Sequence, residues 1–269
     1  MTRTRLAIVA GVVGFLVVAS SWVSLPVMDA QGTAAQQTPM RVRVQVTQVK
    51  PDMIQQWQSL MREALPALKK AGMAWRHVWQ DGGPFGAGST FITVQPVTNF
   101  AQFDQPNAVR RGMGDDAYAK YQAKLTPTIV SSRAWIDVYQ REASIESGAK
   151  AMPPLALVQS WQVLPGKTAE FVELWRTEYR PRYQKAGVRD AWLHTSTYGG
   201  HVGQVTIVRS LSKYAELDQT PGLMQRGGLS AEAAQKLNAR RAALVSGFEQ
   251  TVIRHLPELS YGMPSGATN

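Results

Sequence analysis

The sequence contains two copies of one structural unit, and this internal repeat constrains the fold more than any other feature. The segment from Val44 to Pro51 is matched by the segment from Leu157 to Pro165, and each is a β-rich run that ends at a proline. A helical pattern follows each proline, and both patterns stop at the tripeptide Lys-Ala-Gly. The glycines of these tripeptides, Gly72 and Gly187, suit the left-handed position just after a helix. The sequence therefore predicts two equivalent halves.

Each half continues with the same series of elements. The runs that begin at Trp75 and Trp192 each predict a strand, a glycine turn and a return strand. Shorter helical segments follow, and each half ends in a last strand. The resulting order, β-α-β-β-α-β, is that of ferredoxin-like domains, whose antiparallel sheet carries helices on one face only. Two such sheets can cover each other's bare faces.

This tandem arrangement resembles the dimeric α/β-barrel superfamily, which includes antibiotic-biosynthesis monooxygenase-like, EthD-like and NIPSNAP-like proteins. The resemblance extends from about Met40 to Pro257. The residues that carry it are the run Leu164-Pro165-Gly166-Lys167 leading to Phe171 and Trp175, the paired Ala-Gly helix ends, and the repeated Asp-Gln segments at 104–105 and 218–219. In that superfamily two domains pack sheet to sheet, and pockets lie between a sheet and the helices on its other face.

We therefore predict an α+β protein, with two tandem ferredoxin-like domains packed sheet to sheet as an intramolecular dimeric α/β-barrel. The linker rich in Ser, Ala, Gly and Pro after residue 144 marks the boundary between the halves. The predicted divisions are a signal peptide at 1–30, a disordered linker at 31–39, the first half at 40–145, a linker at 146–153, the second half at 154–258 and a tail at 259–269.

The N-terminus has the order of a secretory signal. Arg3 and Arg5 precede an apolar stretch at 6–18, which small residues and a polar segment rich in Gln and Ala follow. An apolar core of about 13 residues is short for a membrane span. We expect cleavage after Ala30 or Ala34 and a periplasmic or secreted protein. The alternative is an uncleaved anchor, because apolar residues after the small ones could lengthen the segment to about 20 residues.

Charge and cysteine content narrow the possible classes of protein. The formal net charge is +10, but the basic residues form no run of five or more and no nucleic-acid-binding signature accompanies them. We expect no nucleic-acid partner, and membrane contact only through an uncleaved N-terminus. The absence of cysteine excludes a thiol nucleophile, an iron–sulfur cluster and a lipobox anchor.

Strong catalytic and cofactor motifs are absent. The sequence has no G-x-S-x-G elbow, no phosphate-binding loop, no dinucleotide fingerprint and no H-E-x-x-H. The four histidines, His77, His194, His201 and His255, lack the spacing of a metal site. We therefore expect neither a metal nor a cofactor.

The candidate site residues come from strand alternation. His77 shares a strand face with Trp75 and Trp79. His194 occupies the same position of the repeat, two residues after Trp192, and alternation groups it with Trp192, Ser196 and Tyr198 on the corresponding face of the second half. We assign His77 as a candidate acid/base or ligand-orienting group, with Trp75, Trp79, Tyr121 and His194 as candidate ligand-binding residues. Both histidines could equally be structural sheet residues. The glycine-rich loop after Asp81 and the extra aromatics of the first half favour a pocket near His77.

Two classes of function remain open. The first is an exported small-molecule-binding protein; the resemblance implies a cofactor-independent oxygenase, an isomerase or a haem-handling enzyme, acting on an aromatic or hydrophobic compound. The second is a non-catalytic periplasmic binding or protein-interaction module that uses the intramolecular pseudo-dimer as a scaffold. Fold alone does not choose between them. The sequence identifies neither the ligand nor whether the protein is an enzyme.

Overall fold

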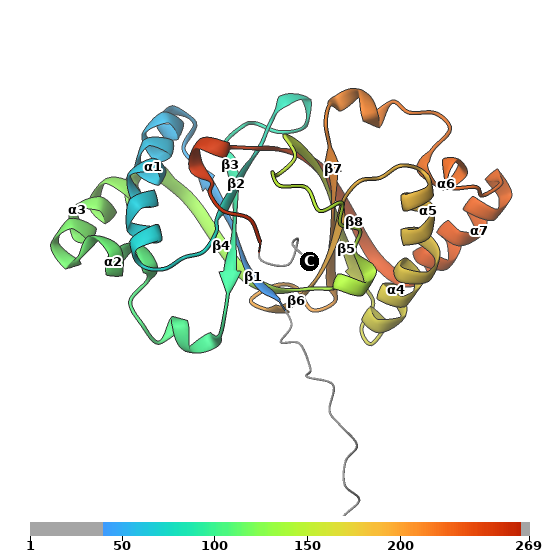
Figure 1. Ribbon diagram of the computed structural model, residues 1–269, viewed down its shortest axis with the longest axis horizontal. Helices are drawn as coiled ribbons and strands as arrows, with labels where there is room; N and C mark the ends of the chain where they lie inside the picture. The colour runs from blue at the N-terminus through green and yellow to red at the C-terminus, as the bar shows by residue number, and fades with distance from the viewer. Residues whose placement is uncertain (1–39, 265–269) are drawn as a thin grey trace, which may run out of the picture. The chain divides into compact units, whose positions relative to one another are not determined.

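A computed structural model describes residues 40–264, and the predicted signal peptide and the linker at 31–39 lie outside this range. The described residues form one compact unit, with a sheet in the middle and helices on two opposite sides (Figure 1). No helix in this part of the chain has the length and the apolar character needed to cross a membrane.

Eight antiparallel strands form a closed barrel in the order β1-β3-β2-β8-β5-β7-β6-β4. Each half contributes four strands. The first half supplies β1 (Arg41–Val49), β2 (His77–Asp81), β3 (Thr90–Val97) and β4 (Ile129–Tyr139), and the second supplies β5 (Leu155–Val163), β6 (Ala191–Tyr198), β7 (Gln204–Leu211) and β8 (Val245–His255).

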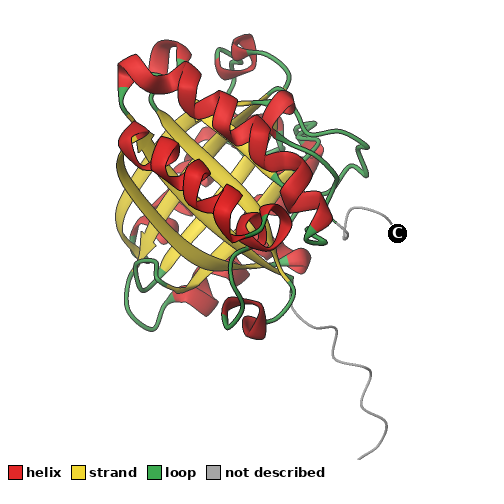
Figure 2. Cartoon of the chain, turned by 90° about the vertical axis from the view of Figure 1, so that its left-hand side faces the viewer, coloured by secondary structure: helices red, strands yellow, loops and turns green. Residues whose placement is uncertain are grey.

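The helices cover the outside of the barrel. The first half has α1 (Ile54–Lys70), α2 (Ala108–Met113) and α3 (Asp115–Leu125). The second half has α4 (Thr168–Leu174), a π-helical turn (Trp175–Tyr179), α5 (Arg180–Lys185), α6 (Leu223–Arg226) and α7 (Ala231–Ala242). Figure 2, seen from the side of α1, shows helices of the first half lying across the barrel strands.

The structure confirms the predicted fold class and adds the way in which the two sheets join. Instead of only facing each other, the sheets pair at both edges: β2 with β8, and β4 with β6. The last strand of each half therefore hydrogen-bonds to the first hairpin strand of the other half. This pairing leaves no free sheet edge, which is the usual site of unwanted strand addition.

An apolar core lies between each half-sheet and its helices. Trp57 of α1 packs against Phe91 of β3 with ring centroids 4.2 Å apart, and Trp175 stacks on Tyr179 at 5.2 Å. Both tryptophans are buried, as large aromatics at helical spacing usually are. Gly72 and Gly187 have φ of +81° and +83°, which confirms the left-handed helix ends predicted from the repeat.

Candidate functional site

A cavity of about 710 Å³ fills the middle of the barrel. Its volume lies within the range of pockets that hold drug-sized ligands. Side chains from all eight strands line it, and its apolar wall consists mainly of Val42, Val44, Val46, Ile92, Val94, Val158, Val208 and Ile253. The resemblance led us to expect pockets between a sheet and its helices, whereas this cavity lies on the opposite face of both sheets.

The two ends of the barrel differ in what borders the cavity. Because neighbouring strands are antiparallel all around the barrel, β1, β2, β5 and β6 all start at the same end. At that end the linker residues Glu146 and Met152 and the later residues Met263 and Pro264 line the cavity. The opposite end carries the turns of both hairpins, where Arg133 lies 3.0 Å from the Nε2 atom of His201.

Asp137 of β4 is the most buried of the acidic residues that line the cavity. Its side chain is 3% exposed, and its Oδ1 atom has no hydrogen-bond partner. Burial raises the pKa of Asp137 to about 6. Trp135 and Ser196 lie beside this carboxyl and oppose the rise, but the Trp135 Nε1 and Ser196 Oγ atoms are themselves without a hydrogen-bond partner. A ligand that supplies polar atoms here would satisfy all three groups.

The two candidate histidines both face the cavity, and both have a ring nitrogen without a partner. Burial lowers the pKa of His194 to about 4, and burial together with His255 lowers that of His77 to about 4. The Nδ1 atom of His77 lies 3.3 Å from the Nε2 atom of His255, which leaves the His77 Nε2 atom unpartnered. At neutral pH both rings are uncharged, so each can donate one hydrogen bond and accept one.

The strand register corrects the predicted equivalence of His77 and His194. Val94 and Val208 are equivalent, because they pair with Val44 and Val158 of the two first strands. His77 pairs with Val94, whereas the residue that pairs with Val208 is Trp192. His77 therefore corresponds to Trp192. The two histidines differ by two residues in register and share only the inward face.

The structure brings four of the five predicted site residues to one place. Trp75, His77, Trp79 and His194 all line the cavity. Because β2 and β6 lie in different halves, the cavity belongs to both halves and not to the first alone. The sequence placed the pocket in the first half, near His77; the structure adds the strands of the second half to its wall.

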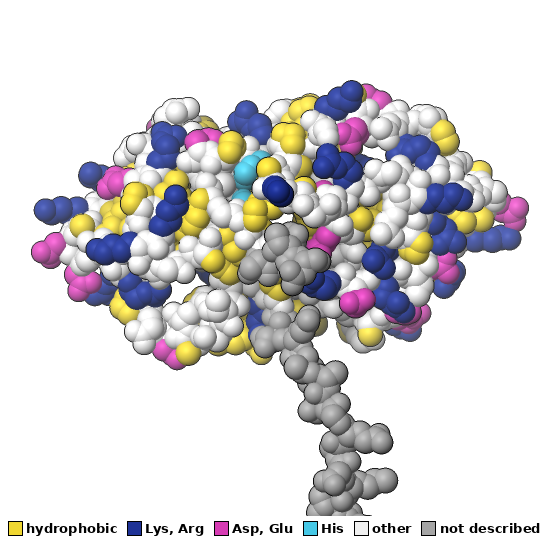
Figure 3. Space-filling model, in the orientation of Figure 1, with side chains coloured by type: hydrophobic (Ala, Val, Ile, Leu, Met, Phe, Trp, Pro, Cys, Tyr) yellow, Lys and Arg dark blue, Asp and Glu magenta, His cyan; other side chains and the backbone are white. Residues whose placement is uncertain are grey.

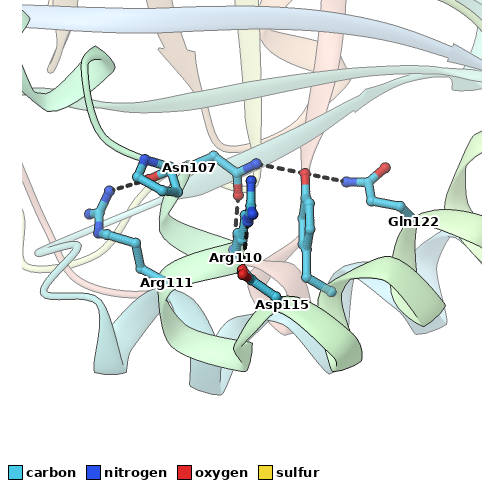
Figure 4. A network of polar contacts seen from close by, with 7 residues as sticks. Asn107, Arg110, Arg111, Asp115 and Gln122 are labelled. Atoms are coloured by element: carbon cyan, nitrogen blue, oxygen red, sulfur yellow. Dashed lines mark hydrogen bonds and ion pairs between the residues drawn. The ribbon is translucent and has the colours of Figure 1, made fainter.

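Tyr121 does not reach the cavity, because α3 packs on the outer face of the sheet. Tyr121 is buried with Trp57 and Phe91 in the core between helices and sheet. The neighbouring Tyr118 belongs to a polar network at the corner between α2 and α3, where its hydroxyl accepts hydrogen bonds from Asn107 and Gln122 (Figure 4). The extra tyrosines of α3 are therefore scaffold residues, and Tyr121 is not a ligand-binding residue of this cavity.

A β-bulge turns Tyr198 away from the face predicted by simple alternation. The pairing of β4 with β6 shifts between Asp137, which faces Ser196, and Ile136, which faces Tyr198. Tyr198 consequently lies outside the barrel, 62% exposed, with its ring 5.2 Å from that of Phe100.

Asp137 and Trp135 are the site residues that sequence reasoning missed. The signal was present in the sequence, because Asp137 is a single acid inside the otherwise apolar and aromatic run from Trp135 to Tyr139. Alternation places Trp135, Asp137 and Tyr139 on one face. At the same face the Tyr139 hydroxyl donates a 2.6 Å hydrogen bond to Glu146 of the linker.

The positions of the acidic residues and histidines show whether the described residues could hold a metal ion or a haem group. Within residues 40–264, no three His, Cys, Asp or Glu side chains are grouped so as to hold a metal ion. A histidine-ligated haem between a sheet and its helices would need an axial ligand on that face. His77, His194 and His255 lie on inward-facing strand positions and His201 on a hairpin turn, so the histidines do not fit such a group.

No protein-family model and no curated protein matches the sequence. Several solved structures resemble the fold. An anthrone oxidase-like protein superposes with a TM-score of 0.58 at 13% identity, over 82% of this chain and 92% of that protein. A proposed monooxygenase from Fusobacterium nucleatum gives 0.55 at 12% identity, over 82% and 94%. A mutant chlorite dismutase from Candidatus Nitrospira defluvii gives 0.52 at 10% identity, over 81% and 92%.

These proteins are members of the dimeric α/β-barrel superfamily, and the likeness shows that this chain has the same fold. At such low sequence identity the likeness carries no information on substrate. The surface charge does not indicate a partner either, because Lys and Arg side chains are scattered among Asp and Glu over the face seen in Figure 3.

Proposed function

We propose that the protein binds a small, planar, largely apolar molecule inside its barrel and removes a proton from it, with Asp137 as the base. The observation that carries this proposal is the buried carboxyl of Asp137, whose Oδ1 atom has no hydrogen-bond partner, in a cavity of about 710 Å³. A buried carboxylate oxygen without a partner is costly, and acids perturbed by burial are found preferentially at functional sites.

The wall of the cavity supports an aromatic or hydrophobic ligand. The indoles of Trp75, Trp79, Trp135 and Trp192 provide flat apolar surface, and valine and isoleucine side chains fill much of the remainder. The unpartnered polar atoms of Trp135, Asp137 and His194 supply few but directional contacts. This combination of an apolar wall and a few converging polar groups is typical of small-molecule sites.

Asp137 is better suited than His77 to act as the base. A general base works best when its pKa lies near the working pH. The pKa of Asp137 is raised to about 6, whereas that of His77 is lowered to about 4. We therefore assign proton abstraction to Asp137, and ligand orientation to His77 and His194.

The proposed step starts with Asp137 as a carboxylate and a ligand with an acidic O–H or C–H group. The carboxylate takes the proton, and the ligand keeps the electron pair as an anion. The Trp135 indole N–H can donate a hydrogen bond to the charge that forms. In an isomerase the same carboxylic acid would return the proton to another carbon; in a cofactor-independent oxygenase the anion would react with molecular oxygen.

A fluorescence titration tests the proposal, because five tryptophans, Trp75, Trp79, Trp135, Trp161 and Trp192, line the cavity. A panel of phenols, naphthols, anthrones and apolar controls would be added to the mature protein, and tryptophan quenching, proton uptake and product formation would be followed. We expect Asp137→Asn to keep ligand affinity within about threefold and to lower turnover at least about a hundredfold, as loss of a general base typically does. Asp116→Asn, on the exposed side of α3, is the matched control.

The outcome also separates the two classes of function. Binding without turnover in the unmodified protein would favour a non-catalytic binding module and would contradict the proposed step. Absence of quenching by every compound, together with native mass spectrometry that finds no retained ligand, would contradict the binding site itself.

We also propose that the protein works outside the cytoplasm, in the periplasm or as a secreted protein. The support is the N-terminal pattern of two arginines, an apolar core and small residues. N-terminal sequencing of the exported protein tests this. We expect a first residue between about Gln31 and Gln36; an intact Met1 in washed membranes would indicate an anchor instead.

A further inference from the structure

Arg76 is buried on the helix-facing side of the first half, away from the barrel cavity. Its side chain is 6% exposed. The adjacent residues Trp75 and His77 line the cavity, so alternation turns Arg76 outward towards α1. There its Nη2 atom donates to the Met61 sulfur at 3.2 Å, and its backbone pairs with Tyr261 through N–O distances of 2.9 and 2.8 Å.

Among residues 40–264, the groups around Arg76 include hydrogen-bond donors, and no acid is among the charged groups that act on it. The Arg76 Nε atom and the Tyr261 hydroxyl are both buried without a partner. The Lys69 ammonium lies 5.0 Å from the centre of the Tyr261 ring. The charged and titratable groups that act on Arg76 are Tyr121, Tyr261 and Arg43, which are two phenols and a second cation.

Arg43 of β1 is a second cation near Arg76, so it increases the local positive charge. Its Nη1 atom donates to the Gln45 side chain at 2.7 Å. Among the described residues, neither Arg43 nor Arg76 takes part in an ion pair. A guanidinium does not lose its proton in a protein, so burial leaves the charge uncompensated.

We propose that Arg76, Tyr261 and Arg43 form an anion site that takes a compact carboxylate. A carboxylate offers two acceptor oxygens to the planar guanidinium and the phenol, and this matches the unpartnered Arg76 Nε and Tyr261 hydroxyl. The bound anion would connect β1, α1 and the segment after β8, so it stabilises the first half. The site lies across the sheet from the barrel cavity and does not depend on the function proposed for that cavity.

An anion titration of the folded protein tests this site. Thermal unfolding would be followed while sodium acetate replaces a bulky sulfonate at constant ionic strength, because a ligand that binds only the folded state raises its stability in a saturable way. We expect saturable stabilisation of the unmodified protein by acetate. We expect Arg76→Met to weaken the apparent acetate affinity at least tenfold, and Tyr261→Phe to weaken it several-fold.

Arg209 of β7 provides the matched control. It is also buried, at 7% exposure, with an unpartnered Nε atom, but Glu216 is among its charged neighbours. Arg209→Met should keep the acetate response of the unmodified protein.

Three results would overturn the proposal. The first is an unmodified protein that shows no saturable response to acetate, and the second is an Arg76→Met variant that responds as the unmodified protein does. The third is an equal response to chloride, which would contradict the assignment to a carboxylate. Should Arg76→Met fail to fold, an unchanged acetate affinity in Tyr261→Phe takes the place of the second result and is decisive against the site.

Discussion

At the scale of a single residue, ionisation of Asp137 affects both the proposed chemistry of the cavity and the stability of the protein. Its pKa is raised to about 6 by burial, so the folded state keeps a proton that the unfolded chain loses. The free energy of unfolding should therefore fall as the pH rises from about 4 to 6, and should stay lower above that range. With the pKa of Asp137 raised to about 6, this loss of unfolding free energy amounts to roughly 3 kcal/mol.

We predict that Asp137→Asn removes this pH dependence. The variant should match the unmodified protein near pH 4 and exceed its unfolding free energy by up to about 3 kcal/mol at pH 7, because asparagine has no charge to bury. Urea unfolding at pH 4, 5, 6 and 7 measures the difference. A difference that is constant over this range would show that Asp137 is not the buried acid described above.

His194 should change the pH dependence of stability in the opposite direction, because its pKa is lowered in the folded state. Its pKa is lowered to about 4, so its contribution to stability is complete above its ordinary value of 6.5 and is lost as the pH falls towards 4. We predict that His194→Gln flattens the acid side of the stability profile by about 3 kcal/mol. His201→Gln, at an exposed turn position, is the control. Identical acid profiles for the two variants would contradict the lowered pKa of His194.

The residue scale is also where sequence reasoning reached its limit. Alternation correctly placed Trp75, His77 and Trp79 on one face, because a strand repeats every second residue. It failed at Tyr198, where a bulge inserts one residue, and it did not select Asp137, because burial of an acid depends on strands of the other half. Tyr121 was misplaced because its helix packs on the outer face.

At the scale of elements, helix packing explains why an Arg-Gly pair occurs at the same place in both halves, as Arg111-Gly112 and as Arg226-Gly227. A Cβ atom added at Gly112 of α2 would collide with the Ala67 carbonyl group of α1, and one added at Gly227 would lie 2.6 Å from the Arg182 carbonyl oxygen. In the first half the glycine lets α2 approach α1 closely, and in the second half it lets the end of α6 approach α5 closely. The recurrence of this glycine can be seen in the sequence, but the helix contact that requires it can be seen only in the structure.

We predict that Gly112→Ala destabilises the protein more than Gly72→Ala. Overpacking against backbone typically costs 1 to 3 kcal/mol, and we expect about 3 kcal/mol here because the backbone of α1 cannot give way cheaply. Gly72 has φ of +81° and open space around its Cα atom, so alanine there should cost only about 1 kcal/mol of backbone strain. Chemical unfolding of both variants gives the comparison. Equal costs would mean that α1 and α2 can separate freely.

At the scale of the whole molecule, the repeat in the sequence predicted the architecture but not the closure of the barrel. Local patterns around Gly72, Gly187 and the hairpin turns define two copies of one unit, and two bare sheet faces must then meet. The pairing of β2 with β8 and of β4 with β6 joins residues far apart along the chain. Local periodicity contains no information on such pairs, and the sequence therefore predicted a pocket near His77 without the share of its wall that the second half supplies.

Closure of the barrel leads to the last prediction, which concerns the halves in isolation. A fragment of residues 40–145 would expose the free edges of β2 and β4 and an inner face that carries Val42, Val44 and Val46. Free edges and large apolar faces promote association. We expect the fragment to aggregate or to form a homodimer in which β2 of each copy pairs with β4 of the other, and the fragment of residues 154–258 to behave in the same way. Size-exclusion chromatography with light scattering measures the mass, and a soluble folded monomer of either fragment would contradict the dependence of each half on the other.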